Sequence, residues 1–329
     1  MSTIAVLGAG AWGTALALVI ARNGHTVRFW GHDANEITQI VAARENKRYL
    51  PGFPLPENIH PDHRIEEVMK DVDGILFVVP SHAFREILLY AKPFITEKIS
   101  LAWASKGLDP ESHHFLSDVV KSIFPAKPFS ILSGPSFAQE VAEEKPTAVT
   151  LASNDDQVAA FWQSVLHNQQ YFRLYLSKDL IGTQLGGAVK NVFAIATGVA
   201  IGLSLGANTQ AALITRGMSE MMRLGAALGA QPETFMGLSG MGDMILTCTD
   251  NQSRNRRFGR MIGEGKSMSE ALSEINQVVE GVQATMHIHV MAKQLGVEMP
   301  IAEQVYAVLY EHKSAKDAVV ALLQRPIRP

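Results

Sequence analysis

The chain has 329 residues, of which 47% are hydrophobic and 19% charged, and its formal net charge is −3. This length suits two domains with large buried cores, and the mildly acidic charge argues against a nucleic-acid or anionic-membrane partner. The single cysteine, Cys248, can form no disulfide within the chain, which fits a reducing cytoplasm. Because we find no uninterrupted apolar span of about 20 residues, we expect a soluble, cytoplasmic protein.

The first apolar run leads directly into a glycine motif. Residues 3–7 are typical of a strand, Gly8, Gly10 and Gly13 follow in G-x-G-x-x-G spacing, and residues 12–22 continue as a small-residue apolar helix. In a dinucleotide-binding turn the first glycine permits the tight turn, the second lets backbone N–H groups reach the pyrophosphate, and the third lets the helix pack closely. The helix N-terminus adds a partial positive charge. The order of these elements favours a dinucleotide site over a glycine-rich turn that only packs.

Short apolar runs alternate with helical patterns as far as about residue 177, which predicts a doubly wound, parallel, Rossmann-type sheet covered on both faces. Four prolines between Asn46 and Asp62 predict a shaped loop without a regular element, which could fold over a cofactor. From residue 178 onward the patterns are helical. We therefore expect a nucleotide-binding α/β domain at 1–177 and a mainly α-helical domain at 178–329. The expected strands are residues 3–7, 26–30, 74–79, 100–104, 129–132, 148–152 and 171–176.

The end of the second expected strand bears on the choice of dinucleotide. Asp33 lies about 20 residues beyond Gly13, the spacing at which an acidic side chain often binds the ribose 2′-hydroxyl of NAD. His32 precedes it and could donate to the 2′-phosphate of NADP. Asp33 could instead cap a helix that begins near Ala34. The sequence leaves both cofactors open.

Ligands of open α/β sheets lie beyond the carboxyl ends of the strands. The residues that follow the third, fourth and fifth expected strands are polar or small, as ligand-binding loops often are, although ordinary turns share this composition. These stretches are Pro80-Ser81-His82, Ser105-Lys106-Gly107 and Ser133-Gly134-Pro135-Ser136.

Lys190 stands within an otherwise apolar, small-residue helix pattern. Thr183 and Thr197 share its helix face, since each is seven residues away. Burial disfavours the charged form of a lysine and brings its pKa toward neutrality, as a proton donor and acceptor requires. The alternative is a lysine that extends its ammonium to the surface. Small neighbours that would leave room for a ligand are Gly186, Gly187 and Ala194.

A second polar cluster follows in the helical half. Asp243 and Thr247 are four residues apart and would share a helix face, from which Asp243 could orient Lys190. Ser253, Arg254 and Asn255 read as a helix start that presents a guanidinium, an amide and free N–H groups to an anion. A solvated basic helix face explains the further basic residues Arg256, Arg257 and Arg260 at least as well.

The histidines and the cysteine give no sign of metal or thiol chemistry. None of the 11 histidines has a metal-ligand spacing with cysteine or carboxylates, so we expect no metal site. His113 and His114 are expected on one surface helix, and His287 and His289 on another. Cys248 is expected to be a core residue rather than a nucleophile.

The whole chain closely resembles the bacterial-type NAD(P)-dependent glycerol-3-phosphate dehydrogenases. That resemblance implies a Rossmann domain, a helical domain and the interconversion of dihydroxyacetone phosphate and sn-glycerol 3-phosphate for glycerophospholipid synthesis. Two mild departures from the family pattern are Ala11, where serine is common, and Ser136, where threonine is common. The motifs that carry the resemblance are Gly8-Ala9-Gly10-Ala11-Trp12-Gly13-Thr14, Val78-Val79-Pro80-Ser81-His82, Ser105-Lys106-Gly107-Leu108, Ser133-Gly134-Pro135-Ser136-Phe137-Ala138, Leu185-Gly186-Gly187-Ala188-Val189-Lys190-Asn191 and Gln252-Ser253-Arg254-Asn255-Arg256-Arg257.

The resemblance also implies roles for single residues. Lys190 would be the proton acceptor of alcohol oxidation, and Lys106 would be a second lysine that contacts the substrate. Asp243 and Thr247 would support the catalytic lysine and the substrate hydroxyls. Substrate contacts would come from Lys106, Gly134, Ser136, Lys190, Asp243, Ser253, Arg254 and Asn255. Dinucleotide contacts would come from Gly8, Gly10, Ala11, Trp12, Gly13, His32, Lys106, Ala138, Arg254, Val278 and Glu280.

Two competing functions remain open from the residues alone. A 3-hydroxyacid or ketopantoate reductase would share the two-domain plan but would need a carboxylate site in place of a phosphate site. A redox-sensing module would bind NAD(P) without chemistry, although the embedded Lys190 argues against it. The apolar faces of the helical half make a homodimer plausible, and the small-molecule substrate is the only other partner expected.

Overall fold

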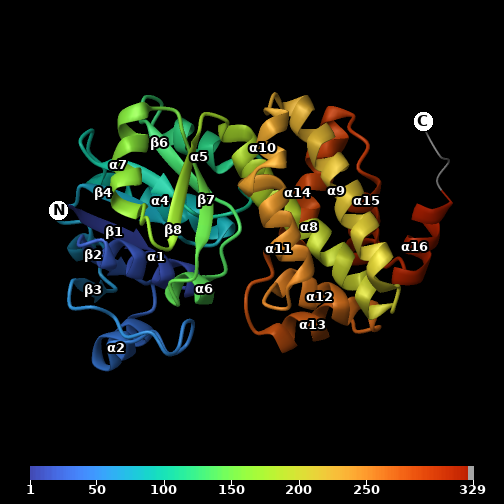
Figure 1. Ribbon diagram of the computed structural model, residues 1–329, viewed down its shortest axis with the longest axis horizontal. Coiled ribbons are helices and arrows are strands. Elements are labelled where there is room, and N and C mark those ends of the chain that lie inside the picture. Colours follow the sequence, from blue (N-terminus) through green and yellow to red (C-terminus); the bar gives the residue numbers. More distant parts are fainter. Residues whose placement is uncertain (325–329) are drawn as a thin grey trace. The chain divides into compact units, whose positions relative to one another are not determined.

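The computed structural model describes residues 1–324 and confirms the expected fold class, a Rossmann-type sheet followed by helices (Figure 1). The sheet has eight strands in the order β3-β2-β1-β4-β5-β6-β7-β8. This order reverses direction between β1 and β4, the topological switch point beside which dinucleotides bind in such sheets. The strands are β1 (Thr3–Leu7), β2 (Thr26–Trp30), β3 (Ile59–Asp62), β4 (Gly74–Phe77), β5 (Ser100–Trp103), β6 (Phe129–Ser133), β7 (Thr147–Ser153) and β8 (Phe172–Ser177).

Helices cover both faces of the sheet, so its central strands are buried on both sides and form continuous apolar runs. One core lies under α1, α6 and α7, and the other lies under α3, α4 and α5. The helices of this region are α1 (Ala11–Arg22), α2 (Ala34–Ala43), α3 (Ile65–Val68), α4 (Ser81–Ala91), the 3₁₀ turn η1 (Lys92–Phe94), α5 (Leu116–Ile123), α6 (Ala138–Ala142) and α7 (Asp156–Leu166).

Two expectations about the sheet are wrong. The stretch between Asn46 and Asp62 contains a regular element, β3, which makes eight strands rather than seven. Proline in a strand normally argues against it, but β3 is the edge of the sheet, where a missing N–H costs least. The sheet is also mixed, because β7 runs antiparallel to β6. The intervening α6 spans only about 8 Å at 1.5 Å per residue, about half the length of β6, so the chain enters β7 from the end at which it left β6.

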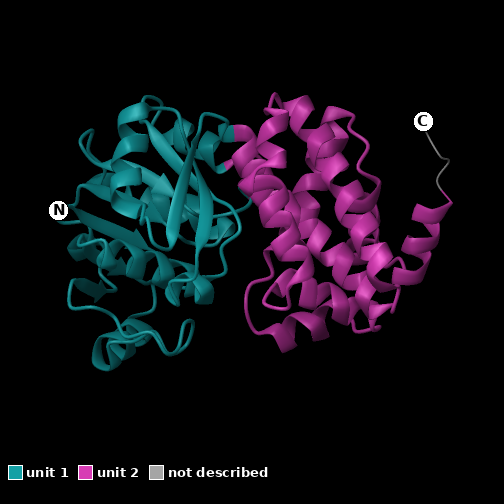
Figure 2. Ribbon diagram, viewed as in Figure 1, with its two compact units in different colours: residues 1–109, 116–180 teal, residues 110–115, 181–329 magenta. Residues whose placement is uncertain are grey.

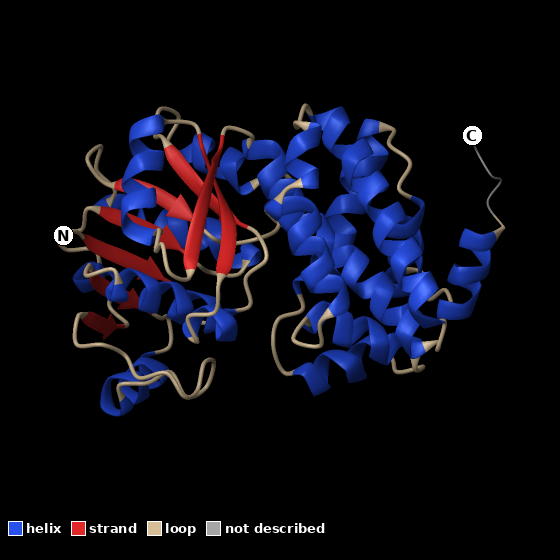
Figure 3. Ribbon diagram, viewed as in Figure 1, coloured by secondary structure: helices blue, strands red, loops and turns tan. Residues whose placement is uncertain are grey.

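The remaining described chain is helical (Figure 3). The described polypeptide forms two compact units, residues 1–109 with 116–180 and residues 110–115 with 181–324, of which the second is coloured magenta in Figure 2. The division after residue 180 is close to the domain boundary expected after residue 177. The sequence did not indicate that Pro110–Phe115 belongs with the helical unit. The helices here are α8 (Leu180–Gly202), α9 (Gly206–Leu228), α10 (Pro232–Met236), the π turn η2 (Leu238–Gly242), α11 (Asp243–Thr249), α12 (Arg254–Gly263), α13 (Met268–Ile275), α14 (Glu280–Leu295), α15 (Pro300–Tyr310) and α16 (Ala315–Leu323).

Helix α8 is the core helix of the second unit, and its small residues let α12 approach closely. A Cβ on Gly198 would lie 2.1 Å from the carbonyl oxygen of Arg256, and one on Gly259 would lie 2.1 Å from that of Ile195. Helix α8 is long and apolar enough to cross a membrane by length and composition, although Gln184, Lys190 and Asn191 interrupt its apolar sequence. Because 83% of its most apolar window is buried within the protein, it resembles the core helix of a globular unit.

A buried carboxylate anchors the start of α15. Glu220 on α9 is 2% exposed and accepts hydrogen bonds from the backbone N–H groups of Ile301 (2.8 Å) and Ala302 (3.2 Å). These are orphan donors of the first helical turn, and an anion there is favoured by the helix dipole. Burial nevertheless raises the pKa of Glu220 from 4.5 to about 7, because desolvation outweighs the two hydrogen bonds.

This raised pKa predicts a pH-dependent contribution to stability. The folded chain holds the Glu220 proton more tightly than the unfolded chain, so the free energy of unfolding falls as the pH rises from 4.5 to about 7. The difference between the two pKa values corresponds to a loss of about 3 kcal/mol in the free energy of unfolding. Glu220→Gln keeps an acceptor oxygen but does not titrate. Between pH 5 and pH 8 the free energy of unfolding of this variant should therefore rise relative to that of the wild type. Urea denaturation at several pH values measures it. Glu233→Gln on the exposed start of α10 is the control, and parallel stability profiles for wild type and Glu220→Gln would refute the prediction.

Candidate active site

The glycine motif forms the turn that a pyrophosphate needs. A Cβ on Gly8 would lie 2.5 Å from the carbonyl oxygen of Val78, and one on Gly13 would lie 1.8 Å from that of Gly8, so both positions are closed to side chains by neighbouring backbone. A Cβ on Gly10 would meet nothing within 4 Å. Gly10 is the N-cap of α1 and provides no side-chain cap for the N–H groups of the first turn. The buried Nε1 of Trp12 also has no hydrogen-bond partner within residues 1–324. The turn therefore fits a dinucleotide phosphate.

The residues after β2 divide their roles. Asp33 is the N-cap of α2, where its Oδ1 accepts from the N–H groups of Asn35 (2.8 Å) and Glu36 (3.1 Å). Of the two roles left open for Asp33, the structure establishes the helix cap. His32 is exposed immediately before it. Neither position decides between NAD and NADP.

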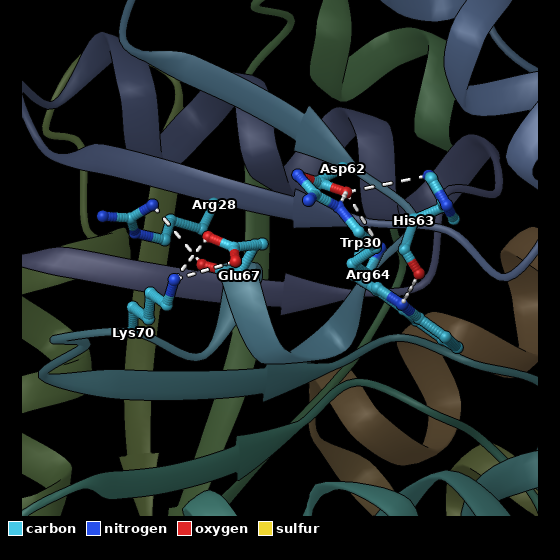
Figure 4. A network of polar contacts seen from close by, with 7 residues as sticks. All are labelled: Arg28, Trp30, Asp62, His63, Arg64, Glu67 and Lys70. Carbon is cyan, nitrogen blue, oxygen red and sulfur yellow. Dashed lines mark hydrogen bonds and ion pairs between the residues drawn. The ribbon is translucent and has the colours of Figure 1, made fainter.

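A polar network ties the carboxyl ends of β2 and β3 together (Figure 4). The indole Nε1 of Trp30 donates to the carbonyl oxygen of His63 (2.9 Å), and Arg64 donates to Asp62 through its guanidinium (2.8 Å) and its backbone N–H (2.9 Å). The hydrogen bond from Arg64 holds the pKa of the Asp62 carboxyl below its ordinary value. The network fixes the strand ends beside the position of His32.

The loops after β5 and β6 meet, as expected from adjacent parallel strands. Lys106 Nζ donates to the carbonyl oxygen of Gly134 (2.9 Å), and Ser136 Oγ donates to the same oxygen (3.0 Å). Ser105 Oγ donates to the carbonyl oxygen of Val79 (2.5 Å), which joins the ends of β4 and β5. Three of the predicted substrate residues are thus brought together. Ala138 follows nearby in the chain as the first residue of α6.

Sequence reasoning missed the support of the Lys106 loop. The Arg85 guanidinium on α4 donates two hydrogen bonds to the carboxylate of Asp109, at 3.0 Å and 2.7 Å, and Asp109 is fully buried. A bidentate pair of this kind fixes orientation as well as distance. The two residues are 24 positions apart, so no local pattern could have paired them.

The second cluster is built around Lys190. Its side chain is 8% exposed, and its Nζ lies 2.5 Å from Oδ1 of Asp243, which is 1% exposed. The ammonium is therefore held in the interior, so the alternative of a lysine that reaches the surface is wrong. Asp243 pairs with Lys190 as expected, from the first turn of α11. Thr247 Oγ1 donates to the backbone carbonyl of Asp243 (2.6 Å), which fixes the start of that helix.

The π turn η2 places Asp243 against α8. Such turns occur frequently at functional sites. A Cβ on Gly186 would lie 2.2 Å from the carbonyl oxygen of Ser239, within η2. The expectation that Gly186 leaves room for a ligand is therefore wrong, since backbone fills this space. Thr183 and Thr197 are fully buried, as their position on the lysine face predicts.

The third cluster is the start of α12. Ser253 is the N-cap, and its Oγ accepts from the N–H of Arg256 (3.2 Å). Arg254 follows, and its surface as a whole is exposed to solvent. Desolvation by surrounding protein still lowers the pKa of its guanidinium below the ordinary value, against the opposing effect of Glu280, the first residue of α14. Val278, two residues earlier, is 42% exposed.

Asn255 has a structural role that the sequence did not indicate. It is 9% exposed, its Nδ2 donates to Oδ1 of Asn191 (2.9 Å), and its Oδ1 accepts from the N–H of Gly281 (2.8 Å). Asn191 follows Lys190 on α8, and Gly281 follows Glu280 on α14. One amide side chain thus aligns three helix segments that carry candidate site residues.

Two further expectations concern the histidines and the cysteine. His113 and His114 lie in the segment before α5 rather than on a surface helix, and His287 on α14 is buried with its ring 5.0 Å from that of His113. His287 and His289 do lie on one helix, α14, but His287 faces the interior rather than the surface. Cys248 is fully buried in α11, and desolvation raises the pKa of its thiol to about 12, so its assignment as a core residue is confirmed.

Comparison with known proteins agrees with this site. The family model for the NAD-dependent glycerol-3-phosphate dehydrogenase N-terminus matches residues 3–159, and the model for the C-terminus of the same enzymes matches residues 179–320. A glycerol-3-phosphate dehydrogenase [NAD(P)+] of Colwellia psychrerythraea is 51% identical over 98% of this chain and 97% of its own. The corresponding protein of Aeromonas hydrophila is 49% identical over 98% and 97%.

Comparison with solved structures supports the same family at the level of the fold. The glycerol-3-phosphate dehydrogenase of Coxiella burnetii superposes with a TM-score of 0.96 at 46% identity, over 98% of this chain and 99% of its own. A ketopantoate reductase from Ralstonia eutropha reaches a TM-score of 0.59 at 15% identity, over 96% and 99%, which shows a shared fold alone. With both halves matched in sequence and the glycine turn, the Lys106 loop and the Lys190–Asp243 pair in place, the chain belongs to the NAD-dependent glycerol-3-phosphate dehydrogenase family.

Proposed function

We propose that this chain interconverts dihydroxyacetone phosphate and sn-glycerol 3-phosphate with NAD or NADP. Relatives named glycerol-3-phosphate dehydrogenase [NAD(P)+] match nearly its whole length. The observation that carries the proposal is the buried ion pair between Lys190 and Asp243 in a chain whose other unit carries a dinucleotide turn. A sensor that only binds the dinucleotide needs no buried acid or base, so this pair favours an enzyme.

The proposed chemistry is one hydride and one proton transfer. The nicotinamide, when bound, supplies the hydride that reaches the ketone carbon. Lys190 donates its Nζ proton to the carbonyl oxygen, which becomes the hydroxyl of glycerol 3-phosphate, and it takes the proton back in the reverse direction. Asp243 holds the ammonium in place, and Thr247 holds the helix turn that presents Asp243.

The remaining site residues would bind and orient the substrate and the dinucleotide. Arg254 and the first turn of α12 suit a phosphate, because a guanidinium fork and helix N–H groups both match its oxygens. Fixing the phosphate aligns the carbonyl for reaction. We assign substrate contacts to Lys106, Gly134, Ser136, Lys190, Asp243, Ser253, Arg254 and Asn255, and dinucleotide contacts to Gly8, Gly10, Ala11, Trp12, Gly13, His32, Lys106, Ala138, Arg254, Val278 and Glu280.

A substrate panel tests the function. Oxidation of NADH and of NADPH is followed by nicotinamide absorbance with dihydroxyacetone phosphate, with ketopantoate and with 3-oxoacids. Turnover is expected only with dihydroxyacetone phosphate. Turnover with a carboxylate substrate instead would assign a different reductase, and no turnover with any substrate would favour the sensor. The ratio of KM values for NADH and NADPH then gives the cofactor preference.

Replacing Arg254 with alanine is expected to raise KM for dihydroxyacetone phosphate by about tenfold to a hundredfold, the usual effect of losing hydrogen bonds to a charged group. The change in kcat should be smaller, because the lost contact is remote from the reacting carbon. Steady-state kinetics at saturating cofactor measures both constants. Arg257→Ala, an exposed arginine on the same helix, is the matched control. Equal effects of the two substitutions would leave Arg254 as part of a solvated basic face.

We also propose that the enzyme is a cytoplasmic homodimer that feeds glycerophospholipid synthesis. Exposed apolar side chains on α16, Val320 at 47% and Leu323 at 78%, support an association surface on the helical unit. Sedimentation velocity at micromolar concentration tests the association, and a monomer there would contradict it.

A further inference from the structure

A buried asparagine outside the glycine motif holds the motif in shape. Asn46 lies between α2 and β3 and is 1% exposed. Its Nδ2 donates one hydrogen to the carbonyl oxygen of Ala9 in the glycine motif (2.9 Å) and the other to Oγ1 of Thr14 in α1 (2.8 Å). Its Oδ1 accepts from the N–H of Tyr49 (3.3 Å), which fixes the side chain in turn.

Thr14 passes this restraint on to Gly10. Thr14 is fully buried, and its Oγ1 accepts from Asn46 while donating to the carbonyl oxygen of Gly10 (2.8 Å). Asn46 therefore restrains the carbonyl of Ala9 directly and that of Gly10 through one hydroxyl. Both carbonyls belong to the residues between the first and third glycines of the motif.

The direction of a carbonyl sets the direction of the next N–H. In a trans peptide the C=O of one residue and the N–H of the next lie in one plane and point in opposite directions. Holding the carbonyl of Ala9 on the Asn46 side directs the N–H of Gly10 the other way. The carbonyl of Gly10 accepts from both the backbone N–H (2.9 Å) and the hydroxyl of Thr14, so the first turn of α1 and Asn46 together direct the N–H of Ala11. Gly10 faces open space, since a Cβ there would meet nothing within 4 Å. These are the donors that a pyrophosphate requires.

We infer that Asn46 is a positioning residue for the dinucleotide, which orients the N–H groups of Gly10 and Ala11 toward the pyrophosphate without touching it. The inference rests on the proposed function, because it presumes that the turn binds NAD(P). Gly8 and Gly13 are held by close packing against neighbouring backbone, and Asn46 holds the peptide groups between them. The proline-containing stretch after α2 thus serves the cofactor through its first residue.

The chain offers a matched control in the same connection. Asn58 also donates both Nδ2 hydrogens to backbone carbonyls, those of Ala21 (2.9 Å) and His25 (2.8 Å). Ala21 lies in the last turn of α1 and His25 lies just after it, away from the glycine turn. Asn46→Ala and Asn58→Ala therefore each remove two hydrogen bonds donated by a side-chain amide, one pair at each end of the helix.

The test is direct binding of NADH and NADPH to the intact protein, measured by nucleotide fluorescence, together with the thermal midpoint of each variant. We expect Asn46→Ala to weaken cofactor binding by about tenfold, the scale of misdirected hydrogen bonds to a charged phosphate. Asn58→Ala should lower the midpoint but change Kd less than about twofold, since it leaves the turn intact. Thr14→Val, which is nearly isosteric, should weaken binding in the same direction and serves if Asn46→Ala does not fold.

The outcomes separate the two claims. Equal Kd values for wild type and for both turn variants overturn the role of Asn46, as does an equal loss in Asn58→Ala, which would indicate general destabilisation. ADP-ribose carries the pyrophosphate and adenosine does not, so only ADP-ribose should compete less well in Asn46→Ala. A wild-type protein that binds neither nucleotide overturns the proposed function itself.

Discussion

Replacing Lys190 with alanine is expected to lower kcat for the reduction of dihydroxyacetone phosphate by at least about 100-fold, the lower end of what a positioned acid or base contributes. Without the ammonium, no group on α8 at that position donates a proton to the alkoxide that forms as the hydride arrives. The KM for NADH should change little, since the glycine turn lies in the other compact unit. Steady-state kinetics over a range of pH measures the effect.

Lys190→Met and Lys316→Ala are the companions of that variant. Lys190→Met keeps an apolar stem of similar length, so its loss of kcat reports the proton rather than a cavity. Lys316 is exposed on α16 and should tolerate alanine without loss. Unchanged turnover in both Lys190 variants would remove this lysine from the chemistry.

Replacing Asp243 with alanine is expected to destabilise the helical unit by about 3–5 kcal/mol, the usual cost of removing one partner of a buried ion pair. The cost arises because the Lys190 ammonium stays in the interior without its carboxylate, while both side chains are almost inaccessible to water in the native protein. Urea denaturation followed by circular dichroism measures the free energy of unfolding.

A double-mutant cycle shows whether the pair accounts for that loss. In the variant carrying both Lys190→Met and Asp243→Ala, neither charge of the pair is left in the interior, so the protein should be more stable than Asp243→Ala alone. Additive losses would mean that Asp243 stabilises the unit through other contacts. The double variant should remain as inactive as Lys190→Met, because restored stability does not restore the proton.

The alternation of apolar runs and helical patterns was sufficient to predict the sheet, because parallel strands buried on both faces leave continuous apolar runs in the sequence. It failed at β3, where Pro61 obscures an edge strand, and at β7, whose direction depends on the length of α6 rather than on its own residues. Strand composition does not distinguish a parallel from an antiparallel neighbour.

The candidate site was predictable where one residue contradicts its surroundings. Lys190 is visible as the charged residue of an apolar helix, and Asp243 as an acid beside small residues of a later turn. Asn46 and Asp109 carry no such signal, since their partners Ala9 and Arg85 lie 37 and 24 positions away. Gly186 was misinterpreted because a glycine that admits another backbone looks in sequence like one that admits a ligand.

The grouping of Pro110–Phe115 with the helical unit means that the polypeptide passes from one unit to the other three times, after residues 109, 115 and 180. A proteolytic fragment that ends at residue 180 would thus carry six residues whose packing partners, His287 among them, have been removed. When this enzyme is divided into halves, each half should accordingly expose aggregation-prone surface. The halves should recover their solubility when they are expressed together.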